Sequence, residues 1–162
     1  MRRYLVVANQ TLVSEELLEI VRARTVTEGA TFHVVVPATP VRERRVWTNG
    51  KAHALARDRL DHALKQFAEL GADATGEVGD ANPMAAIADA LWTRAFDGIV
   101  LSTLPPGRSE WLRQDLPSRV ARAFGVHVTH VVARKALLPG QPSRAPWAHR
   151  RGKARASSTP GT

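Results

Sequence analysis

Five short segments with the composition of β-strands, separated by stretches with helical spacing, constrain the fold of this chain more than any other feature. They lie at residues 4–8, 31–36, 74–78, 98–101 and 127–132. Several are continuously apolar, as is typical of strands buried on both faces of a parallel sheet. Between them, apolar residues recur at three- and four-residue steps, for example at Leu60, Leu64 and Phe67. The alternation predicts an α/β fold in which helices cover both faces of a parallel sheet.

Residues that start and end helices support these boundaries. Ser14 precedes two glutamates, a pattern typical of a helix N-cap, and Asn82 followed by Pro83 marks another helix start. Gly29 and Gly125 follow helical runs, where glycine commonly ends a helix. The short links favour one doubly wound, five-stranded parallel sheet. If the chain reverses direction after the third strand, the order is 3-2-1-4-5, with the switch point between strands one and four.

The 162 residues suffice for one compact domain and a tail. We expect the α/β domain at residues 1–135 and a basic tail at 136–162, which is rich in Pro, Ser, Arg and Gly and is expected to be disordered. The net charge of +8 lies mostly at the C-terminal end, because seven basic residues and no acidic one occur from Arg134 onward. Subtracting these 7 from 23 leaves 16 basic against 15 acidic residues in residues 1–133, so that part of the chain is nearly neutral.

Cysteine is absent from the chain, which excludes disulfides, thiolate chemistry and cysteine zinc sites. The first apolar run, at residues 4–8, is too short for a signal peptide or a membrane span. We therefore expect a soluble cytoplasmic protein without a membrane partner.

Small and polar residues follow the predicted strands, where an open parallel sheet forms its ligand crevice. Such turns let backbone amides approach an anion. The candidate nucleotide- or anion-binding residues at these positions are Ala8, Asn9, Pro37, Val78, Gly79, Asp80, Ser102, Thr103 and Gly107. Structural roles stay open for some of them, since Ser102 and Thr103 could simply form turns and Asp80 could cap the helix that starts at Pro83.

Arginines cluster after the fourth strand, at Arg108, Arg113 and Arg119. Guanidinium groups pair well with phosphate oxygens, so we add Arg108 and Arg113 to the candidate anion site. The alternative is that the arginines face solvent or pair with Glu110 and Asp115.

Three segments, at residues 3–9, 77–88 and 98–102, match a known family pattern in order and spacing. Through these matches residues 1–133 resemble the universal stress protein family. The second match is the most distinctive, with Gly-Asp, then a proline and an alanine-rich helix. The resemblance implies a Rossmann-like fold of the adenine nucleotide alpha hydrolase type, with the strand order given above. It also implies that ATP binds at the crevice in some members.

ATP-binding members of that family carry the motif G-x2-G-x9-G-[ST] after the fourth strand. Gly107 and Ser118 match its second half, and Ser102 stands near the first glycine. Pro117 replaces the third glycine and removes an amide donor. Asn9 stands where the family usually has an acidic residue, so that position carries no charge. The resemblance thus implies a degenerate motif that binds ATP, another nucleotide or an anionic metabolite, with Ser118 as a further site residue.

Other catalytic and metal-binding patterns are absent from the sequence. It contains no G-x-x-x-x-G-K-[ST], no G-x-G-x-x-G after the first strand and no G-x-S-x-G. His53 and His62 would lie on opposite faces of a helix, and His127 and His130 on opposite faces of a strand. We therefore expect neither an enzyme nor a metal requirement.

The last predicted strand would form an exposed edge of the sheet, and exposed edges invite pairing. The family resemblance implies a homodimer through this strand, at Val128, Thr129, His130, Val131 and Val132. The leading hypothesis is a binding or signalling module of the universal stress protein type. The alternative is a ligand-free dimeric scaffold whose basic tail binds nucleic acid or an acidic partner.

Three tryptophans carry separate expectations. Trp92 is expected in the core, because it continues the apolar run of its helix. Trp111 either lines the crevice or packs beneath the loop. Trp47 lies in a polar segment that could cover a ligand or form a mobile surface loop.

Overall fold

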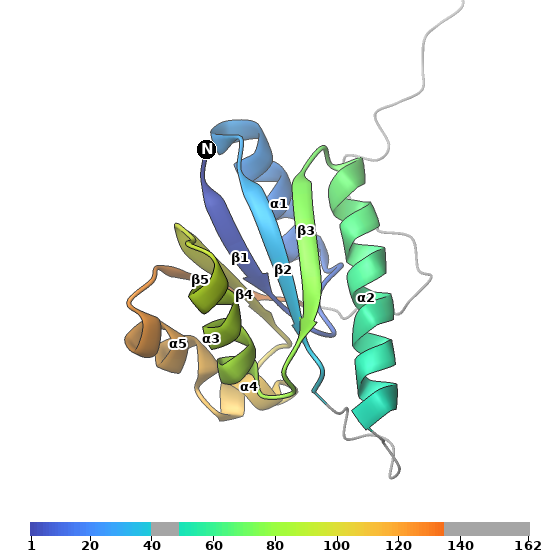
Figure 1. The fold of residues 1–162 in the computed structure, drawn as a ribbon, viewed down its shortest axis with the longest axis vertical. Coiled ribbons are helices and arrows are strands. Elements are labelled where there is room, and N and C mark those ends of the chain that lie inside the picture. The colour runs from blue at the N-terminus through green and yellow to red at the C-terminus, as the bar shows by residue number, and fades with distance from the viewer. Residues whose placement is uncertain (40–48, 135–162) are drawn as a thin grey trace, which may run out of the picture.

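The computed structural model describes residues 1–39 and 49–134 (Figure 1). Trp47 and the predicted tail at 136–162 lie outside these residues. The strands are β1 (Arg3–Val7), β2 (Thr31–Pro37), β3 (Asp73–Gly79), β4 (Gly98–Thr103) and β5 (Val128–Val132). The helices are α1 (Glu15–Glu28), α2 (Asn49–Glu69), α3 (Pro83–Thr93), α4 (Glu110–Arg113) and α5 (Leu116–Phe124).

The five strands form one parallel sheet with the order β3-β2-β1-β4-β5, which confirms the predicted fold class. β1 lies at the centre and pairs with β2 on one side and β4 on the other. Val7 is in register with Val35 of β2 and with Leu101 of β4. The carboxyl ends of β1, β2 and β4 therefore lie at the same edge, and the switch point falls between β1 and β4.

Local signals in the sequence explain where the helices begin and end. The Ser14 side chain accepts a hydrogen bond from the Leu17 amide at the start of α1. Gly29 ends α1 with φ of 58°, a conformation that glycine adopts without strain. Asn82 caps α3 by accepting from the Met84 amide, and Pro83 occupies the first turn.

Two layers of helices cover the two faces of the sheet (Figure 1). On one face, α1 and α2 bury Leu17, Val21, Leu60 and Phe67 against the strands. On the other face, α3 and α5 pack with β1 and β4 around a second cluster. None of the helices in residues 1–39 and 49–134 combines the length and apolar character needed to cross a membrane.

The prediction that Trp92 lies in the core is wrong, because its side chain is 92% exposed. α3 buries Ala86, Ile87 and Ala90 instead. Two residues beyond Ala90 correspond to a rotation of about 200° around the helix, which turns Trp92 away from the sheet. When apolar residues extend around more than one face of a helix, they do not show which face is buried.

The end of β3 approaches α3 so closely that residue 79 has no room for a side chain. A Cβ atom on Gly79 would lie 2.8 Å from the Cβ of Ala86 and 2.9 Å from Cγ1 of Val35. Gly79 therefore supports the packing of the helix on the sheet.

Replacing Gly79 by alanine should lower the free energy of unfolding by about 1–3 kcal/mol, because the added methyl group overpacks a filled interface. Urea denaturation followed by circular dichroism measures this change. Asp89→Ala, at an exposed position of α3, is the control and should stay within about 0.5 kcal/mol of the wild type. A Gly79→Ala protein as stable as the control would contradict the described packing.

Candidate functional site

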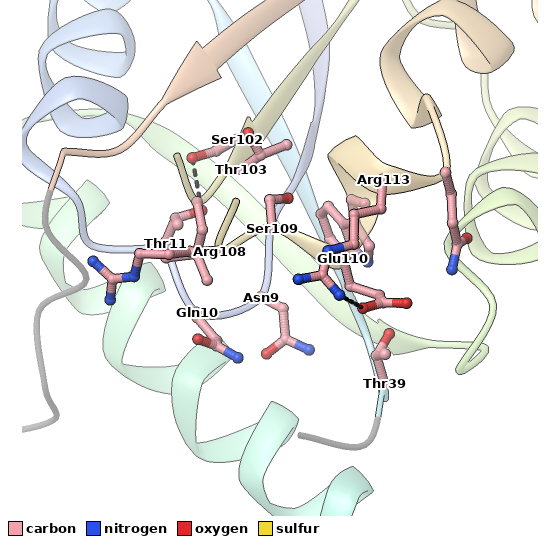
Figure 2. Close-up of a pocket in the computed structure, with 13 residues that line it drawn as sticks. Asn9, Gln10, Thr11, Thr39, Ser102, Thr103, Arg108, Ser109, Glu110 and Arg113 are labelled. Carbon is pink, nitrogen blue, oxygen red and sulfur yellow. Dashed lines mark hydrogen bonds and ion pairs between the residues drawn. The ribbon is translucent and has the colours of Figure 1, made fainter. Parts of the chain in front are cut away.

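A cavity of about 620 Å³ opens at the carboxyl ends of β1 and β4 (Figure 2). Its volume falls within the range of small-molecule sites. The lining residues come from the segment after β1, the segment after β2 and the chain from the end of β4 through α4. They are Asn9, Gln10, Thr11, Thr39, Ser102, Thr103, Leu104, Arg108, Ser109, Glu110, Trp111, Arg113 and Gln114.

The floor of the cavity joins the end of β1 to the end of β4. The hydroxyl groups of Thr11 and Ser102 are hydrogen-bonded at 2.7 Å, and both residues are buried, at 2% and 1% exposure. The two residues are 91 positions apart in the chain. They meet because β1 and β4 are parallel neighbours whose carboxyl ends lie at the same edge.

Asn9, directly beyond the end of β1, is held in one orientation by two partners. Its Nδ2 donates to the carbonyl oxygen of Pro37 at 2.9 Å, and Arg59 of α2 donates to its Oδ1. Arg59 is half-buried, and this burial lowers the pKa of its guanidinium group. The Asn9 oxygen is therefore already engaged by a cation from outside the cavity lining.

The opposite wall is built from the chain between β4 and α5. Ser109 accepts a hydrogen bond from the Leu112 amide and caps the short helix α4. Trp111 is only 7% exposed and packs into the α3/α5 core while lining the cavity. Trp111 thus lines the crevice and also packs beneath the loop, the two roles that the sequence left open. Its packing attaches this wall to the core.

Two arginines supply the positive charge of the site. Arg113 lies 3.8 Å from the Glu110 carboxylate and donates to the carbonyl oxygen of Gly107 at 3.5 Å. No side-chain partner of Arg108 occurs within residues 1–39 and 49–134. Figure 2 shows the Arg113 guanidinium group beside Glu110, whereas the Arg108 side chain extends to the other side of the view. Guanidinium donors thus approach the cavity from two sides.

Thr103 connects the cavity to the edge strand. Its hydroxyl is hydrogen-bonded to Nε2 of His130 on β5 at 2.8 Å. His130 is exposed on this edge strand, but partial desolvation of its imidazole still lowers the pKa below its ordinary value of 6.5. Neutral His130 is therefore the form that the fold favours.

The structure brings five of the predicted site residues together at the cavity. They are Asn9, Ser102, Thr103, Arg108 and Arg113. Arg113 also fulfils the alternative expectation of an ion pair with Glu110, because it lines the cavity and pairs with Glu110 at the same time. Asp115 pairs instead with Arg122, at 3.8 Å.

The other predicted residues lie outside the lining. They are Ala8, Pro37, Val78, Gly79, Asp80, Gly107 and Ser118. Pro37 and Gly107 still contribute, because their carbonyl oxygens accept hydrogen bonds from Asn9 and Arg113. Ala8 and Val78 pack in or against the core on the α1/α2 face. Asp80 accepts from the Asn82 amide at 2.8 Å, so the cap of α3 is Asn82 and not Asp80.

Gly107 and Ser118, the two matches to the glycine motif, do not face one void. Gly107 has φ of 85° and turns the loop after β4. Ser118 is exposed on α5, where Leu116 and Pro117 form the start of the helix. Ser118 is therefore not part of the cavity lining.

Sequence reasoning missed several residues that shape the cavity. Ser109 followed by Glu110 is a helix-start pattern that could have located the wall. Arg59 has no comparable signal, since it lies 50 positions from Asn9 in the chain and reaches it only through packing of α2. The remaining missed lining residues are Thr39 and Gln114.

The arrangement suits binding through hydrogen bonds and positive charge. Hydroxyl and amide groups form the floor, and guanidinium groups approach from the sides. No group of three or more histidine, aspartate or glutamate side chains arranged to hold a metal ion occurs among the residues described above.

Three solved structures with the same architecture are universal stress proteins. One in complex with cAMP is 18% identical, with a TM-score of 0.51 over 80% of this chain and 96% of that chain. A second, from Archaeoglobus fulgidus, is 14% identical, with a TM-score of 0.54 over 83% of this chain and 94% of that chain. A third, from Archaeoglobus fulgidus in complex with dAMP, is 15% identical, with a TM-score of 0.56 over 83% of this chain and 98% of that chain. No protein-family model and no curated protein matches the chain. The chain therefore has the fold of universal stress proteins.

The lowered pKa of His130 predicts that acid destabilises the protein. The unfolded chain binds a proton near pH 6.5, whereas the folded chain binds it only at lower pH, so the free energy of unfolding should fall as pH decreases below 6.5. His130→Gln should reduce this fall. Urea midpoints at pH 7.5 and pH 5.5 measure it. His53→Gln, at an exposed position of α2, should keep the pH dependence of the wild type, and equal slopes in all three proteins would rule out the role of His130.

Proposed function

We propose that this protein is a nucleotide-binding module of the universal stress protein type, and that the cavity between the ends of β1 and β4 is its ligand site. The observation that carries the proposal is the position of the cavity, at the switch point of a sheet with the order β3-β2-β1-β4-β5. Open α/β sheets bind their ligands at this point.

Two further observations support a nucleotide. Structures with this fold include complexes with cAMP and with dAMP. The cavity also places Arg108 and Arg113 beside polar side chains, and this combination suits a ligand with a phosphate group and a polar body. Trp111 adds an aromatic surface to the same wall.

The protein acts in this proposal as a binding or signalling module in the cytoplasm and not as a catalyst. Its described cavity groups are engaged mainly in structural hydrogen bonds, such as those between Thr11 and Ser102 and between Thr103 and His130.

β5 is an edge strand, and we propose that it pairs with a second copy of the chain. The basic segment at 136–162 is then available for nucleic acid or an acidic partner.

Binding at the cavity is tested by adding AMP or ATP to isotope-labelled full-length protein and following backbone amide signals by nuclear magnetic resonance. Signals of residues 9–11 and 102–114 should shift in a saturable way, because these segments line the cavity. Signals at the amino-terminal ends of the strands serve as the internal control and should stay unchanged. No saturable shift, or shifts confined to other regions, would overturn the proposed site and favour the ligand-free scaffold.

A further inference from the structure

We propose that Thr75 on β3 is a site of acyl modification, and that His33 on β2 is the base that activates its hydroxyl group. The acyl donor is a neutral activated ester or thioester. The site lies at the β3 edge of the sheet, on the face that α3 and α5 cover (Figure 1). It does not depend on the ligand cavity, because neither residue belongs to the cavity lining.

The register of β2 and β3 brings three functional side chains together. His33 is in register with Thr75, and Glu77 lies two residues further along β3, so the side chains of Thr75 and Glu77 share one face of the sheet. Nδ1 of His33 lies 2.9 Å from Oγ1 of Thr75, and Nε2 lies 3.2 Å from Oε1 of Glu77. A nucleophile, a base and a group that orients the base are arranged in this way in nucleophilic sites.

The contacts of the imidazole ring determine which nitrogen carries the proton. Arg94, the residue that ends α3, places Nη1 2.8 Å from Nδ1 of His33. A guanidinium group can only donate, so Nδ1 is the acceptor and carries no proton. The proton of neutral His33 is then on Nε2, from which it is donated to Glu77. The lone pair of Nδ1 is therefore on the side of the ring that contacts Thr75, as a general base requires.

Burial differs between the base and the nucleophile. The His33 side chain is only 6% exposed, and its ring stacks on Phe96 with the ring centroids 6.2 Å apart. Thr75, in contrast, is exposed. The packing thus fixes the base beneath the surface, while an acyl donor in solvent can reach the hydroxyl group of Thr75.

Arg94 restrains the reaction in the resting protein. Its Nη1 atom lies 3.5 Å from Oγ1 of Thr75 and donates to the same nitrogen of His33 that the hydroxyl needs as a base. Arg94 is exposed, so its side chain can turn into solvent. The lone pair of Nδ1 is then available to the Thr75 hydroxyl alone.

The chemical step balances without a cofactor. Oγ1 of Thr75 attacks the carbonyl carbon of the donor, and the hydroxyl proton passes to Nδ1 of His33. A new ester bond forms, the bond from the carbonyl carbon to the leaving oxygen or sulfur breaks, and the leaving group takes the proton from Nδ1. A neutral donor fits better than a phosphoryl donor, because the negative charge of a phosphoryl group would be repelled by the Glu77 carboxylate.

The proposal is tested by incubating the full-length protein with p-nitrophenyl acetate and mapping acetyl groups by tandem mass spectrometry of its peptides. Thr75 should gain one acetyl group, and Thr75→Val should lose this label. Thr27 is the internal control, because it is an exposed threonine of α1 whose hydroxyl donates to the carbonyl oxygen of Ala23. An unlabelled Thr75, or equal labelling of Thr75 and Thr27, would overturn the proposal.

Variants of the base separate activation from simple exposure. His33→Gln should slow the labelling of Thr75 at least tenfold, and added imidazole should restore part of the rate in His33→Ala. Arg94→Ala should label faster than the wild type, because it frees the lone pair of Nδ1. This second variant replaces an exposed side chain, so it tests the role of His33 even if the His33 variants do not fold. Equal rates in the wild type and Arg94→Ala would contradict that role.

Glu77 acts through His33 and is therefore a positioning residue. Glu77→Leu should slow the labelling of Thr75, whereas Glu77→Gln should keep an intermediate rate, because its amide oxygen can still accept from Nε2. Thermal unfolding of each variant checks that the fold is intact. Folded Glu77→Leu and Glu77→Gln proteins with the same rate would contradict the positioning role.

Discussion

The parallel pairing of β1 with β4 is the constraint on which the rest of the structure depends. β1 is buried at the centre of the sheet, and its register with β4 places the two carboxyl ends side by side. The hydrogen bond between Thr11 and Ser102 closes the floor of the cavity at this point. The remaining walls are attached to this floor, through Asn9 on one side and through the buried Trp111 on the other. A sheet with a different strand order would disperse these groups and leave no shared cavity.

The sequence was sufficient to predict the fold, because the features that determine it are local or periodic. Short segments of β-strand composition, several of them continuously apolar, marked the strands, and the observed strands start and end within two residues of these segments. The helix ends could be predicted from Ser14, Gly29 and Asn82. The side chains of Ser14 and Asn82 accept hydrogen bonds from backbone amides at the helix starts, and the left-handed backbone of Gly29 ends α1. Trp92 shows the limit of the approach, because composition alone did not indicate which side of α3 faces the sheet.

The site was predicted only in part, since its chemistry depends on contacts between distant segments. Residues at the carboxyl ends of β1 and β4 were correctly expected near the cavity, as Asn9 and Ser102 illustrate. The link from Arg59 to Asn9 could not be derived, because nothing in the spacing of α2 shows which residue reaches β1. Ser118 was assigned through a motif, but it is exposed on α5 and is not among the lining residues. The charge distribution of the cavity therefore depends more on tertiary packing than on any sequence motif in this chain.

The convergence of β1 and β4 can be tested directly, because the natural chain has no cysteine. The pair Thr11→Cys and Ser102→Cys replaces two hydroxyl groups that lie 2.7 Å apart, and it should form a disulfide under mild oxidation. Mass spectrometry after alkylation counts the free thiols. The pair Thr11→Cys and Thr103→Cys is the control, because adjacent strand residues point to opposite faces and should remain reduced. Loss of both thiols in the first pair alone is the predicted result, whereas two free thiols in a folded Thr11→Cys and Ser102→Cys protein would contradict the account.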